Sequence, residues 1–168
     1  MADVLTGKAK IGLIAAPGPG NQRGPVPPAL QAQNATSVTQ TRALAPFSVN
    51  VPVDTAGFQF LQAGVMKQPR QAVVMTFVGE GNRMGFQIFQ APISQSQASP
   101  GGQPTYLVVA DNLTKVTVGG AVGARSTLPP NQGGVTNTSL VWEKGDLLFH
   151  LIAHGLTDQE LTRIATSL

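Results

Sequence analysis

The sequence predicts an α+β fold: an antiparallel sheet of six to eight strands, one C-terminal amphipathic helix packed on a face, and an extended N-terminal arm. Only 11% of the 168 residues are charged, whereas an average soluble domain carries about 25%. Glycine (19 residues) and proline (13 residues) are abundant. A polar but uncharged surface with many turn residues favours short strands and loops, because surface helices are usually rich in Glu and Lys.

Strand patterns follow one another from residue 44 onward. The first, at 47–51, alternates Phe47, Val49 and Val51 with polar residues between two prolines, which is typical of an edge strand. The segment 71–79 is apolar on both sides, as a covered central strand would be. Further strands are expected at 58–65, 84–91, 106–110, 116–118 and 121–128, and a hairpin at 138–143 and 146–153 with its turn at Lys144-Gly145.

Two independent signals predict a helix at the C-terminus. Thr157 and Glu160 have the spacing of a capping box, in which the hydroxyl and the carboxylate each accept from the other residue's backbone amide. Apolar residues then recur at helical spacing, at Leu161, Ile164, Ala165 and Leu168. We therefore expect one short helix whose apolar stripe packs on the sheet.

Residues 1–43 are expected to form an arm with a Pro/Gly-rich linker, and residues 44–168 a single α+β domain. The stretch 17–33 holds five Pro and three Gly, which disfavour both helix and strand pairing. The segment 8–16 before it is short and apolar, with nothing local to pair with. Four basic side chains against Asp3 in residues 1–42 account for the whole net charge of +3.

The composition argues against several classes of function. The absence of Cys rules out disulfides and thiolate chemistry. Lys and Arg are not clustered as phosphate binding requires, so no nucleic-acid partner is expected. His150 and His154 would lie about 13 Å apart on one strand, too far to share a metal ion. No nucleophile elbow or other catalytic constellation is present, and we predict no enzymatic activity, no cofactor and no metal.

The C-terminal third carries a recognisable pattern: a Trp142-Glu143-X-Gly145 hairpin followed by a helix of defined composition. The matching helix residues are Leu156, Thr157, Glu160, Leu161, Ile164, Ala165, Ser167 and Leu168. This pattern resembles a bacterial domain family without an assigned biochemical function. Members occur at the extracytoplasmic C-terminal end of anti-sigma factors and in related secreted or lipid-anchored proteins.

The resemblance extends upstream to Pro46-Phe47, Val51-Pro52 and Gly57-Phe58, and so covers roughly residues 44–168. Two departures limit what it implies. Asp54-Thr55-Ala56 replaces the usual Leu-Pro of the family, and the zinc-binding anti-sigma head is absent. The resemblance therefore implies an extracytoplasmic accessory or sensing role and not the sequestration of a sigma factor.

The expected function is that of a non-catalytic extracytoplasmic module in a sigma/anti-sigma envelope-stress system, acting through contacts with an envelope protein. Its location would depend on an export signal or anchor, which we do not recognise in this chain. Two alternatives remain open: a carrier of a hydrophobic ligand such as a lipid, and a structural homo-oligomer. The aromatic residues that would line a ligand site are Trp142, Phe58, Phe60 and Phe86, although a lone Trp on a strand is more often a core residue.

The arm generates a first prediction. Ile11, Leu13 and Ile14 are too apolar to remain in water, and a Pro-rich spacer of about 50 Å reach would let them contact a neighbouring copy. We expect the chain to self-associate, and deletion of residues 1–30 to shift its solution mass toward the monomer without unfolding residues 44–168. A mass that is monomeric before and after the deletion would contradict this.

Overall fold

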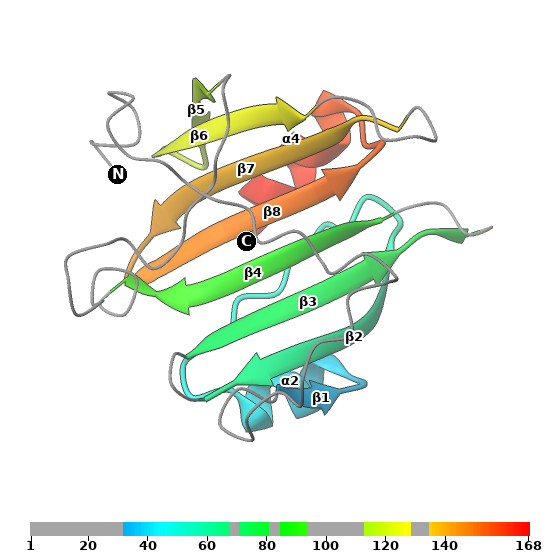
Figure 1. The fold of residues 1–168 in the computed structure, drawn as a ribbon, viewed down its shortest axis with the longest axis vertical. Coiled ribbons are helices and arrows are strands. Elements are labelled where there is room, and N and C mark those ends of the chain that lie inside the picture. Colours follow the sequence, from blue (N-terminus) through cyan, green and yellow to red (C-terminus); the bar gives the residue numbers. More distant parts are fainter. Residues whose placement is uncertain (1–31, 68–70, 81–84, 94–112, 129–134) are drawn as a thin grey trace, which may run out of the picture.

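The computed structural model describes residues 32–67, 71–80, 85–93, 113–128 and 135–168. They form one antiparallel sheet in the order β1-β2-β3-β4-β8-β7-β6-β5 with short helices on one face (Figure 1), which confirms the predicted α+β class. The strands are β1 (Gln33–Ala35), β2 (Gln59–Met66), β3 (Ala72–Val78), β4 (Phe86–Pro92), β5 (Leu113–Val118), β6 (Ala121–Leu128), β7 (Asn137–Lys144) and β8 (Leu147–His154), and the helices are α2 (Val38–Leu44) and α4 (Asp158–Thr166).

The sheet consists of two four-stranded halves that meet in its middle. Strands β1 to β4 follow one another in space as in sequence, and so do β5 to β8 in reverse order. The two halves are joined by β4 and β8, which pair from Phe86↔Ala153 to Pro92↔Leu147. The centre of the sheet is therefore built by residues some 60 positions apart in the chain.

One face of the sheet, which we call the helix face, carries α2, α4 and the connector formed by residues 45–58 (Figure 1). The core lies between these segments and the strands. Its largest fully buried side chains include Trp142, Phe77, Phe86, Phe149 and Met75. The apolar stripe of α4 contributes Leu161, Ile164 and Ala165 to the same core, as its spacing predicts.

The connector is an irregular segment, and the predicted strand at 47–51 is not formed. A strand needs a neighbouring strand to hydrogen-bond with, and an alternating sequence does not guarantee one. In this segment the backbone of Asn50 hydrogen-bonds with a side chain instead. The amide of Gln90, which is fully buried, accepts from the backbone N–H of Asn50 at 2.9 Å and donates to its carbonyl oxygen. This two-way hydrogen bond holds the connector against β4 and lets Val49 and Phe47 pack on the core.

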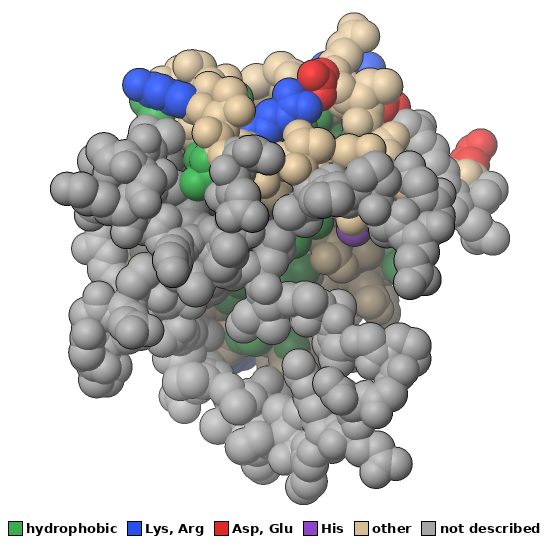
Figure 2. Space-filling model, turned by 45° about the horizontal axis from the view of Figure 1, so that its top comes forward, with side chains coloured by type: hydrophobic (Ala, Val, Ile, Leu, Met, Phe, Trp, Pro, Cys, Tyr) green, Lys and Arg blue, Asp and Glu red, His purple; other side chains and the backbone are tan. Residues whose placement is uncertain are grey.

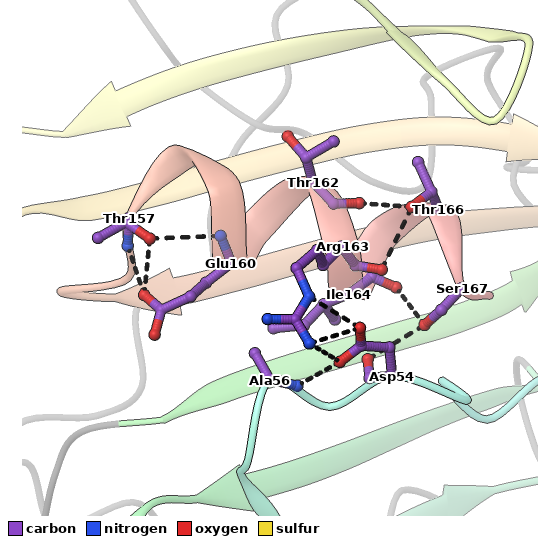
Figure 3. A network of polar contacts seen from close by, with 9 residues as sticks. All are labelled: Asp54, Ala56, Thr157, Glu160, Thr162, Arg163, Ile164, Thr166 and Ser167. Carbon is purple, nitrogen blue, oxygen red and sulfur yellow. Dashed lines mark hydrogen bonds and ion pairs between the residues drawn. The ribbon is translucent and has the colours of Figure 1, made fainter.

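Helix α4 is tied to the connector by a polar network around Asp54 (Figure 3). The Arg163 guanidinium donates to the Asp54 carboxylate through Nε at 2.8 Å and Nη2 at 3.1 Å. Ser167 Oγ donates to the Asp54 carbonyl at 3.1 Å, and Val53 N–H donates to the Ser167 carbonyl at 3.4 Å. At the other end of the helix the predicted capping box of Thr157 and Glu160 is present.

Residues 33–43 belong to the folded part, although the sequence assigns them to the arm. Strand β1 extends the sheet beyond β2, with Ala35 opposite Ala63. Helix α2 begins at Ser37, whose hydroxyl accepts from the Gln40 amide at 3.1 Å. Sheet and helix are thus already present in the ten residues before position 44. A strand as short as β1 carries little alternation of its own, which is why the sequence pattern does not reveal it.

Several other boundaries agree with the sequence or differ slightly. The strands expected at 58–65, 71–79, 84–91, 116–118 and 121–128 correspond to β2, β3, β4, β5 and β6. The β7–β8 hairpin turns at Gly145-Asp146 instead of Lys144-Gly145, with Lys144 opposite Leu147 and Gly145 at φ +60°. The strand expected at 106–110 and the arm up to residue 31 lie outside the described residues.

The Gln90 anchor can be tested by substitution. Gln90→Leu keeps the volume of the side chain but leaves the Asn50 N–H and carbonyl without partners. An unsatisfied buried polar group costs about 1–3 kcal/mol. We expect a loss of about 2–3 kcal/mol in the free energy of unfolding, measured by denaturant titration.

A matched control is Gln87→Leu, three positions away on the same strand. Gln87 is half-buried and lies on the opposite face of the sheet from Gln90. Its side chain makes only a 3.4 Å contact, with Thr76 Oγ1 on the same face. This substitution should change the free energy of unfolding by less than about 1 kcal/mol. Equal losses for the two variants would mean that the Gln90 amide does not anchor the connector.

Candidate functional site

The face of the sheet opposite the helices, which we call the second face, is where the described residues offer a candidate site. The strand register places a row of mostly apolar side chains across its centre: Val74, Phe89, His150, Val141 and Ala124. A second row beside it contains Thr76, Gln87, Ile152, Ser139 and Ser126. Figure 2 shows hydrophobic side chains and a histidine on this side of the molecule.

The two histidines of β8 both point to the second face, and each is paired with a polar side chain of β7. Ser139 Oγ lies 2.6 Å from His150 Nε2. Asn137 Oδ1 lies 2.7 Å from His154 Nδ1. Because an amide oxygen can only accept, His154 carries its proton on Nδ1 in this contact. Each pair gives an imidazole nitrogen and a β7 side chain a hydrogen-bond partner, which the surrounding apolar side chains could not provide.

Burial keeps both rings neutral. Desolvation lowers the pKa of His150 from 6.5 to about 4, and it lowers the pKa of His154 in the same direction. No carboxylate contributes to the pKa of His150, whose shift has desolvation as its only cause. At neutral pH the centre of the second face is therefore uncharged.

A serine bonded to a histidine raises the question of nucleophilic catalysis. Such chemistry needs a base of suitable pKa and a third group that orients it. His150 has a pKa of about 4, too low for an effective base at neutral pH, and no charged neighbour shifts it upward. Ser139 is itself 1% exposed. The geometry fits a satisfied polar pair within an apolar surface better than a reactive site.

A metal site finds no support in the described part of the chain. His150 and His154 lie on the same strand and face, as the sequence predicts, and their separation is about 13 Å at the usual rise of a strand. Among the residues described, no group of three His, Cys, Asp or Glu side chains could hold a metal ion.

The four aromatic residues proposed from the sequence as ligand-binding lie on the helix face. Phe86 contacts Phe58 edge-on, with ring centroids 5.5 Å apart, and stacks on Phe77 at 4.6 Å; Phe77 in turn meets Phe60 edge-on at 5.7 Å. Trp142 is not part of this cluster. It stacks on Phe149 at 5.2 Å, and Phe149 pairs with Gln90, four positions along β4 from Phe86.

Burial decides what these residues can do in this conformation. Trp142 is 0% exposed, Phe86 1% and Phe58 3%, while Phe60 is half-buried. Gly123 opposite Trp142 leaves the space for this packing, since a Cβ there would lie 3.1 Å from the Trp142 Cβ. A ligand could reach Trp142 only by entering between the sheet and its covering layer. Ligand binding at the four aromatic residues stays a prediction.

The Ser139–His150 and Asn137–His154 pairs were not anticipated from the sequence. A signal existed, since both histidines alternate with apolar residues on β8 and the adjacent strand of the same hairpin offers Ser and Asn. Only the register of the hairpin, fixed by its turn, brings these particular residues together.

Comparison with protein-family models, with curated proteins and with solved structures finds no match for this chain. The resemblance in the C-terminal third therefore stays a prediction. Of the helices that the structure describes, none has both the length and the apolar character needed to cross a membrane.

The buried histidines predict a dependence of stability on pH. Folded His150 stays neutral down to about pH 4, whereas the unfolded chain takes up a proton near the ordinary value of 6.5. The free energy of unfolding should therefore fall as the pH drops from about 6.5 to about 4, by at most about 3.5 kcal/mol from His150 at about 1.4 kcal/mol per pKa unit. Denaturant titrations at half-unit steps of pH measure this.

His150→Gln should remove most of this slope, while Ser139→Ala, which keeps the imidazole, should retain it. Asp54 does not interfere: its pKa is lowered chiefly by the Ala56 backbone N–H and by Arg163, so its contribution is lost only below its ordinary value of 3.8. A wild-type stability that is flat between pH 6.5 and 4 would show that the second face is not desolvated in solution.

Proposed function

We propose that this chain is a non-catalytic binding module of the extracytoplasmic envelope-stress type, which acts through protein contacts made by the second face of its sheet. The observation that carries the proposal is the composition of that face. Its two central rows contain apolar and neutral polar side chains, with both histidines uncharged at neutral pH. The cores of protein interfaces have this character, since they are depleted of charged residues.

The partner that fits this face is a protein surface with apolar side chains at its centre and few charges. A charged partner would lose hydration at the two rows without gaining an ion pair, which costs free energy. The rim of the face is polar, with Glu143 and Lys115 at its margins. The link to a sigma/anti-sigma system is supported by the resemblance of residues 44–168 and by nothing in the geometry.

A second function, the carriage of a hydrophobic ligand, has one observation in its favour. The indole Nε1 of Trp142 is buried, and none of the residues that the structure describes is its hydrogen-bond partner. A buried donor of this kind is uncommon, and a carbonyl oxygen of an acyl lipid that entered the core would satisfy it. Titration with acyl lipids would then shift the emission of the single Trp, whereas contacts on the second face would leave it unchanged.

Site-specific photo-cross-linking tests the main proposal. A photoreactive residue at Gln87, on the second face, is compared with one at Thr162, which is exposed on α4. In an envelope extract we expect a discrete protein adduct from position 87, absent from position 162 and suppressed by an excess of unmodified chain. The adduct is identified by mass spectrometry.

Two results would contradict the proposal. An adduct from position 162 alone would move the contact to the helix face. The absence of any protein adduct, together with a saturable shift of Trp142 emission by lipid, would favour the carrier function instead. As a further control, Val74→Glu places a charge in the central row and should weaken the adduct from position 87 without changing the far-ultraviolet circular dichroism.

A further inference from the structure

Two buried donors on the helix face have no hydrogen-bond partner among the residues that the structure describes. They are the indole Nε1 of Trp142 and the Nε of Arg125. Trp142 is fully buried, and the Arg125 side chain is 29% exposed, so the guanidinium reaches from the core to the surface. Because most buried polar groups in proteins are paired, two such donors on neighbouring strands point to a group that accepts from them.

The register of the sheet brings these two side chains together. Trp142 of β7 pairs with Gly123 of the adjacent β6 (Figure 1), and Arg125 is the next residue of β6 on the same face. Diagonal neighbours of this kind lie about 7–8 Å apart, within reach of long and aromatic side chains. One ligand group of a few atoms can therefore contact both donors.

The surroundings of the two donors favour a group that accepts hydrogen bonds without donating any. Of the residues that pair with them, Gly123, Leu140 and Phe149 have no polar side chain, and Thr114 is exposed. Strands β6 and β7 have a neighbour on each side, so their carbonyl groups are used within the sheet. A water molecule would have few groups to receive its own protons. A carboxylate has no proton to place and carries the charge that a guanidinium attracts.

The guanidinium of Arg125 already holds one carboxylate at the surface. Both of its terminal nitrogens donate to Asp158, Nη1 at 3.1 Å. This contact uses the end of the guanidinium and leaves the buried Nε for another acceptor. Because the Asp158 side chain is 73% exposed, its release into water costs little. Asp158 is therefore a competitor, within the chain itself, for a carboxylate that binds Arg125.

We propose that Trp142 Nε1 and Arg125 Nε bind the carboxylate of a fatty acid. One carboxylate oxygen accepts from the indole and the other from the guanidinium, while the Asp158 side chain turns to solvent. The alkyl chain contacts apolar residues of the adjacent β5–β6 hairpin, where Val116 and Ala121 pack on the core and are only half-buried. This inference rests on the carrier function considered above, whose ligand it names, and it does not depend on the second face.

The test compares decanoate with decanol, which has the same chain length but no carboxylate. Binding is followed by the emission of Trp142, the single Trp of the chain. The wild type should bind decanoate about tenfold more tightly than decanol, as charge-assisted hydrogen bonds allow. Arg125→Met should lose this preference, whereas the control Arg163→Met, which removes the ion pair with Asp54 instead, should keep it. Asp158→Asn should bind decanoate more tightly, because the competing carboxylate is gone.

A second measurement needs no variant and so covers the case in which Arg125→Met does not fold. Because the chain has a single Trp, its isotopically labelled form gives one indole N–H resonance. The proton of this resonance should move downfield when decanoate is added and stay nearly in place with decanol. The reason is that a carboxylate forms a shorter and stronger hydrogen bond than a neutral acceptor.

The possible failures separate this inference from the carrier function. Equal affinities for decanoate and decanol, or an indole resonance that decanoate leaves unmoved although it binds, would overturn the carboxylate site and keep the carrier function. Binding of neither compound would overturn both. Equal losses in Arg125→Met and Arg163→Met, or weaker binding of decanoate by Asp158→Asn, would show that the ligand responds to the docking of α4 and not to a free donor.

Discussion

The covering of the helix face is the constraint on which the rest of the structure depends. An eight-stranded sheet must bury one face, and α4 with nine residues and α2 with seven cannot cover it. The irregular connector has to complete the layer, although it has no regular hydrogen bonding of its own. The buried amide of Gln90 supplies what a neighbouring strand would otherwise supply, one acceptor and one donor for the Asn50 backbone.

Two ion pairs complete this layer by holding α4 at its two ends. Near its start, Arg125 of β6 contacts Asp158 through both terminal nitrogens, one of them at 3.1 Å. Nearer its end, Arg163 holds Asp54 of the connector. Both pairs are at least partly exposed, so each adds little stability by itself. Their effect is on position, since they link the helix to the sheet and to the connector and so bury Ile164 and Leu161.

Because the connector and the two helices that the structure describes lie on one side, the two faces of the sheet differ in kind. The helix face is a dense core in which aromatic rings stack, and its largest side chains are fully buried. The second face combines half-buried apolar residues (Val74, Phe89 and Ile152) and buried ones (Val141 and Ala124) with two satisfied histidine pairs. A surface of this composition is suited to contact with another apolar surface, and this asymmetry underlies the proposed binding role.

The sequence by itself determined the class of fold and the features that depend on near neighbours. The capping box and apolar stripe of α4, the β7–β8 hairpin and the apolar run of β3 are all local patterns, and each is present in the structure. The start of α2 also depends on near neighbours, Ser37 and Gln40, but the prediction places residues up to 43 in the arm because the preceding stretch 17–33 is rich in Pro and Gly.

Tertiary structure alone decided the features that join distant residues. The irregular path of residues 47–51 depends on Gln90, forty positions beyond Asn50, and alternation cannot distinguish a strand from a segment held by a side chain. The burial of Trp142 against Phe149, and the pairing of Ser139 with His150, depend on strand register and on which face the helices cover. A periodic pattern shows that a strand has two faces, but only the packing of the chain decides which face the helices and the connector cover.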